Sequence, residues 1–565
     1  MMHFRPISLF LLATALAAQA PTTAVSAPAE RPIPAGAPAA MALIRAQQLQ
    51  AHAEFLASDA LGGRLTGSPG QRKAAEYVAR HFESLGLEPF GDEGKAGEAR
   101  SWFQSYPILR TRLDAEHTRI EVAGQRFADG FSVLPARKPE DVQVKGKLRF
   151  LGVNRVPSDA GNDSLAGAIP VVVLRGSGLP NASVEQEFGV AFSQLTRIQG
   201  VASRLEKRGA RLVVFAILDD HGAIANVLNY MGVHPGKDLV APGKPLAEVL
   251  AMPDMGAMAQ AYAGKTPKVF TSARVSRALL EAMGLSEQGL AAAGDEPAQP
   301  PKAKDATASV GVAVRKEEAQ AVNVVGVLRG GDPKLAKEAV VYSAHMDHVG
   351  TRMDGEVFNG ADDNASGTSG LLEIATAFAK AEARPRRSIV FLSVSGEELG
   401  LWGSAWYAEH PTWEASAMIA NINTDMIGRS GPESGADEVT VTPSYAHGAF
   451  STIVRDAARF ARELGMGLTS GDKYYTRSDH FNFVQKGIPA VFFCNGEHED
   501  YHKVSDHADK LDAQKMERIA RLAFWTGWAV AGADARPQTL GRQTGWDGNT
   551  PRAGKGEKPR GGKKE

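Results

Sequence analysis

The chain contains very little cysteine: Cys494 is the single such residue among 565. One thiol excludes an intrachain disulfide, so the fold must rely on its hydrophobic core and on any metal ions that it binds. Cys494 follows Pro489-Ala-Val-Phe-Phe, a pattern typical of a buried strand. This setting favours a small core residue over a reactive thiol.

The chain also lacks an excess of charge of either sign. Its 63 Lys and Arg residues nearly balance its 64 Asp and Glu residues, for a net charge of −1. Such a protein presents no strong field to nucleic acid or to anionic lipid. The apolar content of 43% and charged content of 22% are those of a soluble globular protein. A chain of 565 residues exceeds what one core usually holds, so two or more domains are expected.

A long apolar run is missing too, although a short one occurs at the N-terminus. Residues 1–6 carry Arg5 and no acid, residues 7–18 are apolar or small, and Ala15-Leu-Ala17 offers a small-x-small cleavage site. The pattern predicts a secretory signal peptide within residues 1–27, and therefore a periplasmic or secreted protein without a transmembrane segment after cleavage. An uncleaved membrane anchor is the alternative.

Changes in composition and in the pattern of apolar residues divide the chain into segments. Residues 41–137 contain two expected helices, at 42–58 and 71–85, whereas short apolar strands over 138–285 predict a separate small α/β domain. From 310 to 535 apolar strands alternate with helices, which predicts an α/β fold with a largely parallel, mixed sheet flanked by helices. The remaining segments are two linkers, at 28–40 and 286–309, and a basic tail at 536–565 that we expect to be disordered.

Three polar groups follow three of the apolar strands. His345 comes directly after the strand beginning at Ala339, Glu397 follows the strand beginning at Ile389, and Asp425 follows the strand beginning at Ile419. In an open α/β sheet, ligands bind at the carboxyl ends of the strands. We therefore expect these three side chains to meet at one edge of the sheet.

Further acidic and histidine motifs accompany them. Asp347 stands two residues after His345, where its carboxylate can accept the second ring N–H of that imidazole. Asp363 precedes Asn-Ala-Ser-Gly, a turn leading into a helix, and its two oxygens can bridge two cations. Glu397 and Glu398 are adjacent and cannot share one side of a regular strand, but both can reach one site from a glycine-rich loop. His502 follows Tyr501, whose hydroxyl can donate to an oxyanion.

Each motif alone is more often structural than functional. A His-x-Asp or Glu-Glu pair is usually a solvated surface feature, and Asp-Asp-Asn is usually a turn. Together, in this order and at strand ends, they predict a site for two metal ions with a general base. Other histidines nearby are expected to be exposed or to support the site from behind, with His480 a candidate for lining the pocket; these are His348, His480, His498 and His507.

Two stretches carry a closer resemblance. Gly360-Ala-Asp-Asp-Asn-Ala-Ser-Gly and Glu397-Glu-Leu-Gly-Leu-Trp-Gly-Ser resemble the M28 family of zinc aminopeptidases, including the Vibrio/Aeromonas and Streptomyces enzymes. The resemblance covers the helices at 42–85 and nearly all of 310–532. It implies a zinc-exopeptidase fold of the phosphorylase/hydrolase-like kind. On weaker grounds, namely position, length and Val-Lys-Gly-Lys, the insert resembles a protease-associated (PA) domain.

The resemblance implies a role for each motif residue. His345 and Asp425 would bind one zinc ion, Glu398 and His502 would bind the other, and Asp363 would bridge them. Asp363 is preferred to Asp362 because the family's bridging carboxylate stands three residues before the serine of the Ser-Gly pair. Glu397 would be the general base, Asp347 would orient His345, and Tyr501 would be an oxyanion donor.

The activity that the resemblance implies is hydrolysis of N-terminal residues from peptides, with two zinc ions per chain. A carboxypeptidase or dipeptidase and a glutaminyl cyclase are alternatives on the same scaffold. A non-catalytic binding relative is an alternative of another class, although the intact Glu397 argues against it. Abundant carboxylates favour a substrate ammonium, and Arg429 and Arg477 are the nearest candidates for gripping a C-terminal carboxylate instead.

Overall fold

Two β-sheets organise the chain in this computed structural model, which describes residues 37–543 except 96–97, 139, 155, 157–162, 176–183, 221, 251–261 and 295–300. The predicted signal peptide and most of the first linker and basic tail lie outside the described residues. Residues 31–565 form one compact unit that includes both sheets. Among the residues that the structure describes, no helix is long and apolar enough to cross a membrane.

The main sheet is mixed, with parallel strands at its centre. Strands β14, β13, β15 and β18 run parallel, whereas β12, β2, β9 and β1 extend the β14 side in antiparallel pairs. The strand order is β17 (Gly467–Ser470), β16 (Glu438–Thr442), β18 (Ala490–Cys494), β15 (Met418–Thr424), β13 (Ala339–His345), β14 (Ser388–Val394), β12 (Val314–Leu328), β2 (Phe103–Leu113) and β9 (Leu239–Pro242), with β1 (Glu88–Pro89) also on β12.

The predicted mixed α/β fold is therefore confirmed, but fewer strands of the sheet run parallel than expected. The segment 323–328 reads as one of the parallel apolar strands, yet it forms the end of β12 and pairs antiparallel with β14. Its other neighbour is β2, from the segment before the second sheet, also antiparallel. Apolar content does not encode strand direction, because a strand buried on both faces has the same composition in either orientation.

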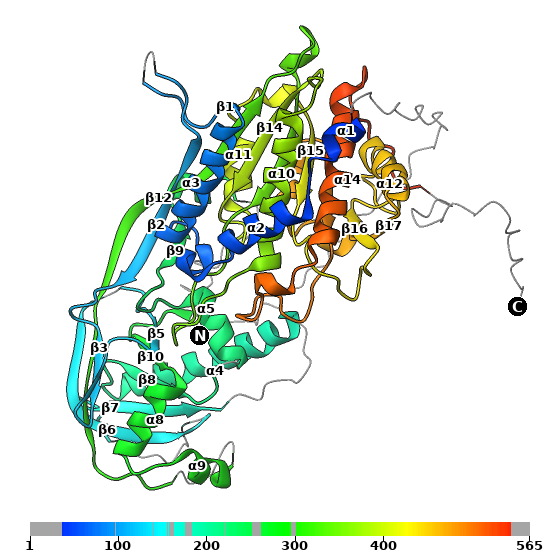
Figure 1. The fold of residues 1–565 in the computed structure, drawn as a ribbon. Coiled ribbons are helices and arrows are strands. Elements are labelled where there is room, and N and C mark those ends of the chain that lie inside the picture. Colours follow the sequence, from blue (N-terminus) through cyan, green and yellow to red (C-terminus); the bar gives the residue numbers. More distant parts are fainter. Residues whose placement is uncertain are drawn as a thin grey trace, which may run out of the picture. The chain divides into compact units, whose positions relative to one another are not determined.

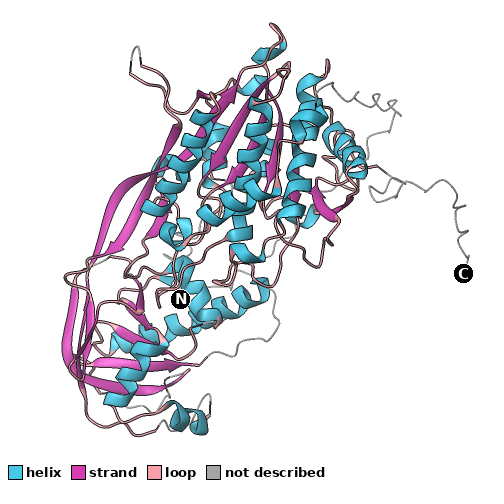
Figure 2. Cartoon of the chain, in the orientation of Figure 1, coloured by secondary structure: helices cyan, strands magenta, loops and turns pink. Residues whose placement is uncertain are grey.

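Helices cover both faces of the main sheet (Figures 1 and 2). Figure 1 shows α2, α3, α10 and α14 together on one face, where their apolar sides and strands β13–β15 form the largest core cluster. Tyr407 and Phe483 from α11 and α13 pack on the opposite face, against Val341 and Leu392. The helices of this part are α1 (Ala37–Met41), α2 (Ala46–Leu56), α3 (Pro69–Ser84), α10 (Gly367–Ala379), α11 (Trp402–Glu409), α12 (Thr452–Glu463), α13 (His480–Gln485) and α14 (Ala513–Gly532), with short 3₁₀ or π turns η1 (Asp59–Arg64), η2 (Leu335–Lys337), η3 (Ala361–Ser366), η4 (Ala415–Ala417), η5 (Asp472–Tyr474) and η6 (Ala508–Lys510).

The local sequence explains where the predicted helices begin. Ser68 stands before α3 and its Oγ accepts a hydrogen bond from the N–H of Gln71 at 3.2 Å, while Pro69 takes the first helical position. Asp512 caps α14 in the same way through the N–H groups of Gln514 and Lys515. Side-chain acceptors at these positions satisfy N–H groups that the helix leaves unpaired.

The second sheet holds most strands of the predicted small α/β region and extends beyond it, whereas β9 of that region pairs with β2 in the main sheet. Its order is β4 (Gln125–Phe127), β3 (Arg119–Val122), β11 (Thr307–Val312), β6 (Val142–Val153), β7 (Ile169–Leu174), β8 (Val213–Ile217), β10 (Lys268–Thr271) and β5 (Phe131–Leu134). The helices of this region are α4 (Val184–Lys207), α5 (Ala223–Met231), α6 (Lys244–Ala247), α8 (Ala273–Ala282) and α9 (Glu287–Ala293).

The ends of this sheet differ from the segment boundaries expected at 138–285. Strands β3, β4 and β5 precede residue 138, and β11 follows residue 285. The expected linker at 286–309 contains α9 and the start of β11, and the chain passes from β11 into β12 of the main sheet within two residues. Composition conceals these elements, because strands of three to six residues need few apolar positions.

Candidate metal centre

Three of the predicted site residues meet at the carboxyl edge of the parallel strands. His345 ends β13, Glu397 follows β14 and Asp425 follows β15. Because β14, β13 and β15 are neighbours, the Nε2 atom of His345 lies 3.2 Å from Oδ1 of Asp425 and 3.9 Å from Oε2 of Glu397. The position expected from strand order is thus the position observed.

The carboxylate of Asp363 lies between two histidines. Its Oδ1 atom is 3.4 Å from Nε2 of His345, and its Oδ2 atom is 3.0 Å from Nε2 of His502. Asp362 points elsewhere: its Oδ1 accepts from the N–H of Gly428 at 2.6 Å, and its Oδ2 lies 3.2 Å from Nε2 of His498. Of the two adjacent aspartates, Asp363 is therefore the one that joins the two halves of the centre.

The adjacent glutamates face different halves. Glu398 Oε2 lies 3.0 Å from Nε2 of His502, whereas Glu397 faces His345. Gly396 permits this divergence, because its φ is +77° and a Cβ there would lie 2.8 Å from Trp402 Cβ and from the Tyr106 hydroxyl. The expectation that a glycine-rich loop lets both carboxylates reach one site is met.

Both the main chain and the side chain of Asp347 lie near Nδ1 of His345. This Nδ1 donates to the backbone carbonyl of Asp347 at 3.3 Å, and the Asp347 carboxylate lies 3.7 Å away. That carboxylate also accepts from the hydroxyl of Thr66 at 2.8 Å, and the same hydroxyl accepts from the N–H of Gly396 at 2.9 Å. Asp347 therefore connects His345 with the loop that carries Glu397.

Two groups that the sequence did not single out as partners contact the centre. Nδ1 of His348 lies 2.5 Å from Oε1 of Glu398, and His348 is fully buried. The hydroxyl of Tyr230, from α5, lies 2.6 Å from Nδ1 of His502. The position of His348, close to His345 in the sequence, could have suggested its role. No local sequence pattern connects Tyr230 to His502, which lies 272 positions away.

Arg64 holds the backbone around the centre from behind. It is buried and donates to the carbonyl oxygens of Met346 at 2.8 Å and Gly360 at 2.9 Å, as well as to those of Leu56 and Asn359. Met346 follows His345, and Gly360 opens the turn that carries Asp363. One guanidinium thus fixes the segments that carry two of the predicted ligands.

Electrostatics identify the centre as a cation site. Burial lowers the pKa of His502, but Glu398 and Asp363 outweigh it and raise that pKa to about 10. Burial raises the pKa of Glu398, yet His502 and His348 hold it well below its usual value. Burial raises the pKa of Glu397 well above its usual value, with Asp425 and Glu398 adding to the effect. The carboxylates therefore attract positive charge strongly, and metal ions would compete with protons for the imidazoles.

The donor set fits zinc. Nε2 of His345, Nε2 of His502 and Oδ1 of Asp425 are buried without a hydrogen-bond partner, although each lies about 3 Å from another candidate ligand atom. Buried polar atoms are normally hydrogen-bonded, so atoms that converge in this way suit a shared cation. Imidazole nitrogen and carboxylate oxygen are ligands that zinc accepts.

A small pocket opens beside the candidate ligands Asp363 and Asp425 and the candidate base Glu397. Its far wall is apolar and its rim holds a salt bridge from Arg477 Nη2 to Glu497 Oε1 at 2.7 Å. The wall is formed by Met426, Tyr474, Phe492 and Cys494, which pack together as one hydrophobic cluster with Tyr501 against it.

The structure also shows where the remaining residues predicted near the site lie. Tyr501 lines the pocket, and its ring stacks on that of His502 with centroids 3.9 Å apart. His480 does not line it; that side chain is buried and stacks on Phe492 at 4.7 Å. Nη1 of Arg429 donates a hydrogen bond to Oδ2 of Asp500 at 3.0 Å. His507 is exposed.

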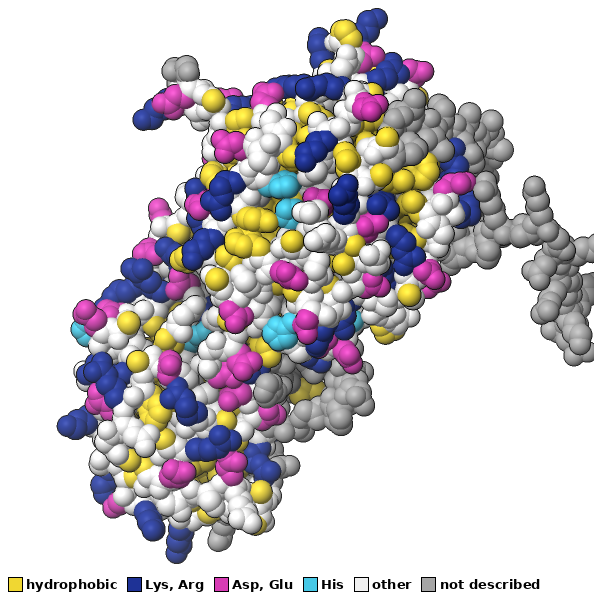
Figure 3. Space-filling model, viewed as in Figure 1, with side chains coloured by type: hydrophobic (Ala, Val, Ile, Leu, Met, Phe, Trp, Pro, Cys, Tyr) yellow, Lys and Arg dark blue, Asp and Glu magenta, His cyan; other side chains and the backbone are white. Residues whose placement is uncertain are grey.

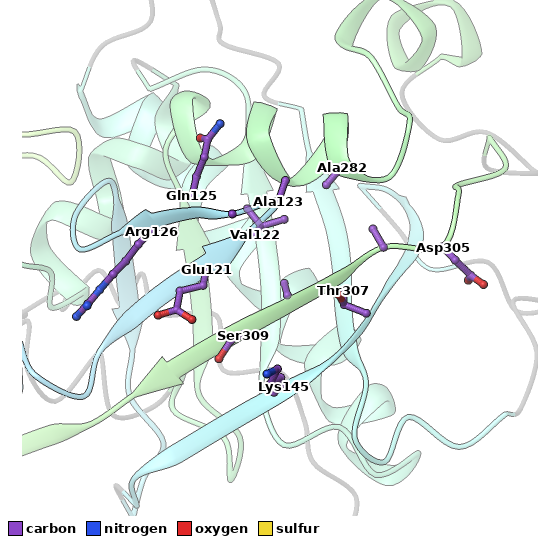
Figure 4. A pocket seen from close by; sticks show the side chains of 13 residues that line it. Glu121, Val122, Ala123, Gln125, Arg126, Lys145, Ala282, Asp305, Thr307 and Ser309 are labelled. Carbon is purple, nitrogen blue, oxygen red and sulfur yellow. The ribbon is translucent and has the colours of Figure 1, made fainter.

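A second, larger pocket, of about 680 Å³, lies on the second sheet and holds none of the predicted site residues (Figure 4). Glu121, Arg126, Lys145 and Asp305 lie along it on separate strands and loops, and the close-up shows them spread over an open sheet face. Size alone therefore does not mark the functional site; converging ligand atoms do.

Comparison with known proteins supports the same assignment. Residues 323–526, which carry all eight predicted site residues, match the model of Peptidase family M28. A probable zinc metalloprotease of Leptosphaeria maculans is 25% identical over 258 residues, covering 39% of this chain and 59% of that protein. Aminopeptidase YwaD of Bacillus subtilis is 28% identical over 234 residues, covering 39% of this chain and 47% of that protein.

The fold comparison agrees. A solved zinc aminopeptidase from Bacillus subtilis covers 88% of this chain and 96% of its own, with a TM-score of 0.51 and 18% identity. This likeness supports the mixed α/β fold. The family match and these relatives concern the peptidase part of the chain, and the solved structure concerns its fold. The chain spans about half the length of the curated relatives that it matches.

Proposed function

We propose that the protein is an exported zinc aminopeptidase that removes N-terminal residues from peptides. The observation that carries the proposal is the carboxylate of Asp363, with one oxygen facing His345 and the other facing His502. His345 and Asp425 would hold one zinc ion, Glu398 and His502 the other, and Asp363 both. Held by these residues, zinc would supply Lewis-acid chemistry for water activation and for polarising the scissile carbonyl.

Glu397 would act as the general base. Its carboxylate faces the centre and has no role in either ligand set, and burial raises its pKa. A carboxylate with a raised pKa can take a proton from the attacking water and return it to the leaving amine. Tyr501, at the wall of the same pocket, would donate its hydroxyl to the developing oxyanion.

The pocket supports recognition of a free N-terminus with an apolar side chain. Met426, Phe492 and Cys494 offer an apolar wall, while Asp363, Glu397 and Asp425 supply negative charge for an α-ammonium group. The one arginine on the pocket wall, Arg477, is paired with Glu497, so its charge is already compensated. This pairing weakens the carboxypeptidase alternative.

Blocking the substrate termini tests the specificity. N-acetylation of a peptide such as Leu-Gly-Gly should suppress cleavage by about tenfold to a hundredfold or more, because a charge-assisted contact of about 1.5–3 kcal/mol is lost. C-terminal amidation should change the rate little. The opposite pattern would indicate a carboxypeptidase, and pyroglutamate formation without cleavage would indicate a cyclase.

Export is part of the proposal and rests on residues 1–27, which lie outside the described residues. N-terminal sequencing of the protein recovered from periplasm or medium should find processing near Ala17 or Ala18. Recovery of the exported protein with Met1 intact would contradict the signal-peptide assignment.

A further inference from the structure

A second cluster of metal-binding side chains lies on three helices outside the candidate metal centre. His52 comes from α2, His81 from α3 and Glu373 from α10, and a ligand atom of each lies within 4.8 Å of the other two. None of the three belongs to the motifs at the strand ends. Figure 3 shows histidine side chains reaching the surface over this helical face.

Each histidine of the cluster has one ring nitrogen already fixed. Nδ1 of His52 lies 2.7 Å from the hydroxyl of Tyr77, and Nε2 of His81 lies 3.2 Å from the carbonyl oxygen of Leu372. Nε2 of His52 is then left for a ligand and faces Glu373. Nε2 of His81 also lies 3.0 Å from Oγ1 of Thr376, so Nδ1 is the His81 nitrogen that would bind an ion. Metal-binding histidines show this arrangement, because a hydrogen bond at the second nitrogen selects the tautomer and aims the ring.

The distance between His52 and Glu373 suits two ligands of a tetrahedral ion. Nε2 of His52 lies 3.4 Å from Oε1 of Glu373. Two ligands at about 2.0–2.1 Å from a tetrahedral zinc ion are separated by roughly 3.3–3.4 Å. A direct hydrogen bond between the same atoms would normally be shorter, at about 2.7–2.9 Å for a charged pair.

The cluster is largely removed from water. Glu373 is 4% exposed and His52 is 8% exposed, so the carboxylate needs a cationic partner in place of water. His81 is only half-buried, which leaves an open side for a water molecule as the fourth ligand.

We propose that His52, His81 and Glu373 form a structural zinc site that ties α2 and α3 to α10. The site would act as a staple in a chain whose single cysteine excludes a disulfide. Its position also connects to the candidate centre, because α10 begins directly after the turn that carries Asp363. The proposal is independent of the proposed aminopeptidase activity.

Zinc counting in a variant without the candidate centre tests the site. The double variant His345→Ala/His502→Ala removes a ligand from each half of that centre. After loading with zinc and gel filtration, elemental analysis of this full-length variant should find one zinc per chain. Adding His52→Ala should reduce the content to none, whereas adding His117→Ala, which removes an exposed histidine, should leave it at one.

A thermal measurement gives an independent reading if a cluster variant folds poorly. Zinc should raise the melting temperature of the double variant, because an ion that binds only the folded state stabilises it. Glu373→Gln, which keeps the size of the side chain, should abolish that rise. The single variant His52→Ala, in which the candidate centre is intact, should lose one zinc and keep its kcat/KM. This result would separate the proposed site from the peptidase centre.

Two results would overturn the proposal. The double variant could retain no zinc and show no thermal response, which would mean that His52 and Glu373 form only an ion pair. Alternatively, the zinc that it retains could be unaffected by both His52→Ala and Glu373→Gln, which would place the ion elsewhere.

Discussion

The hydroxyl of Tyr230 lies 2.6 Å from Nδ1 of His502, and the two rings are 5.9 Å apart between centroids. Tyr230 belongs to α5, in the region of the second sheet, whereas His502 is a candidate zinc ligand of the peptidase part. If His502 held zinc through Nε2, its Nδ1–H would donate to the Tyr230 oxygen. The second-sheet region thus supplies a positioning residue to the centre, and His502 has a left-handed φ of 53° that needs such support.

Removing this contact should weaken zinc binding selectively. Tyr230→Phe keeps the ring but removes the acceptor, and loss of such a contact typically costs about 10–100-fold in metal affinity. Chelator competition on the full-length protein measures that affinity. Tyr342→Phe is the matched control, because its buried hydroxyl donates to the carbonyl of Ala523 at 3.0 Å, away from the centre. Equal zinc affinities in Tyr230→Phe and wild type would refute the positioning role.

The two adjacent glutamates should separate in their effects. Glu397→Gln keeps size and hydrogen bonding but cannot accept a proton, so kcat should fall by about 10²–10⁴-fold or more while zinc content stays normal. Glu398→Ala removes a ligand-type oxygen 3.0 Å from His502 and should reduce zinc occupancy. Turnover and zinc content are measured on the same samples. Near wild-type turnover in Glu397→Gln would show that another group is the base.

Arg64 should be irreplaceable by lysine. Lys keeps the charge, but one ammonium cannot reach the four carbonyl oxygens that the guanidinium contacts. Unsatisfied buried carbonyls cost about 1–3 kcal/mol each, so Arg64→Lys should lower the free energy of unfolding by about 3 kcal/mol or more. Urea denaturation measures this loss. Arg72→Lys, at an exposed pair with Glu76, should change stability by less than about 0.5 kcal/mol. Equal stability of Arg64→Lys and wild type would argue against the clamp.

Local sequence predicted the parts of the centre that follow from strand order. His345, Glu397 and Asp425 were expected to converge because parallel neighbours end at one edge, and they do so. The direction of β12 and the extent of the second sheet were not predictable. The residues of a short or fully buried strand do not indicate which strand it pairs with or in which direction. Tyr230 and Thr66 reach the centre through tertiary contacts from distant segments, which local patterns cannot encode.

The His52–His81–Glu373 cluster illustrates the same limit. The sequence predicted the helices that carry His52 and His81 and the helix that carries Glu373. It did not predict that these side chains meet, because their register across the helix contacts depends on how α2, α3 and α10 pack.

Restoration of metal-free protein tests the central claim most directly. Exhaustive chelation should abolish hydrolysis of a leucine anilide, and zinc should restore it, whereas the N-acetylated anilide should be hydrolysed at least about tenfold more slowly at every zinc concentration. Anomalous scattering at the zinc edge should then show one ion between His345 and Asp425 and another between Glu398 and His502. Full activity of protein shown to be free of metal would contradict the two-zinc aminopeptidase.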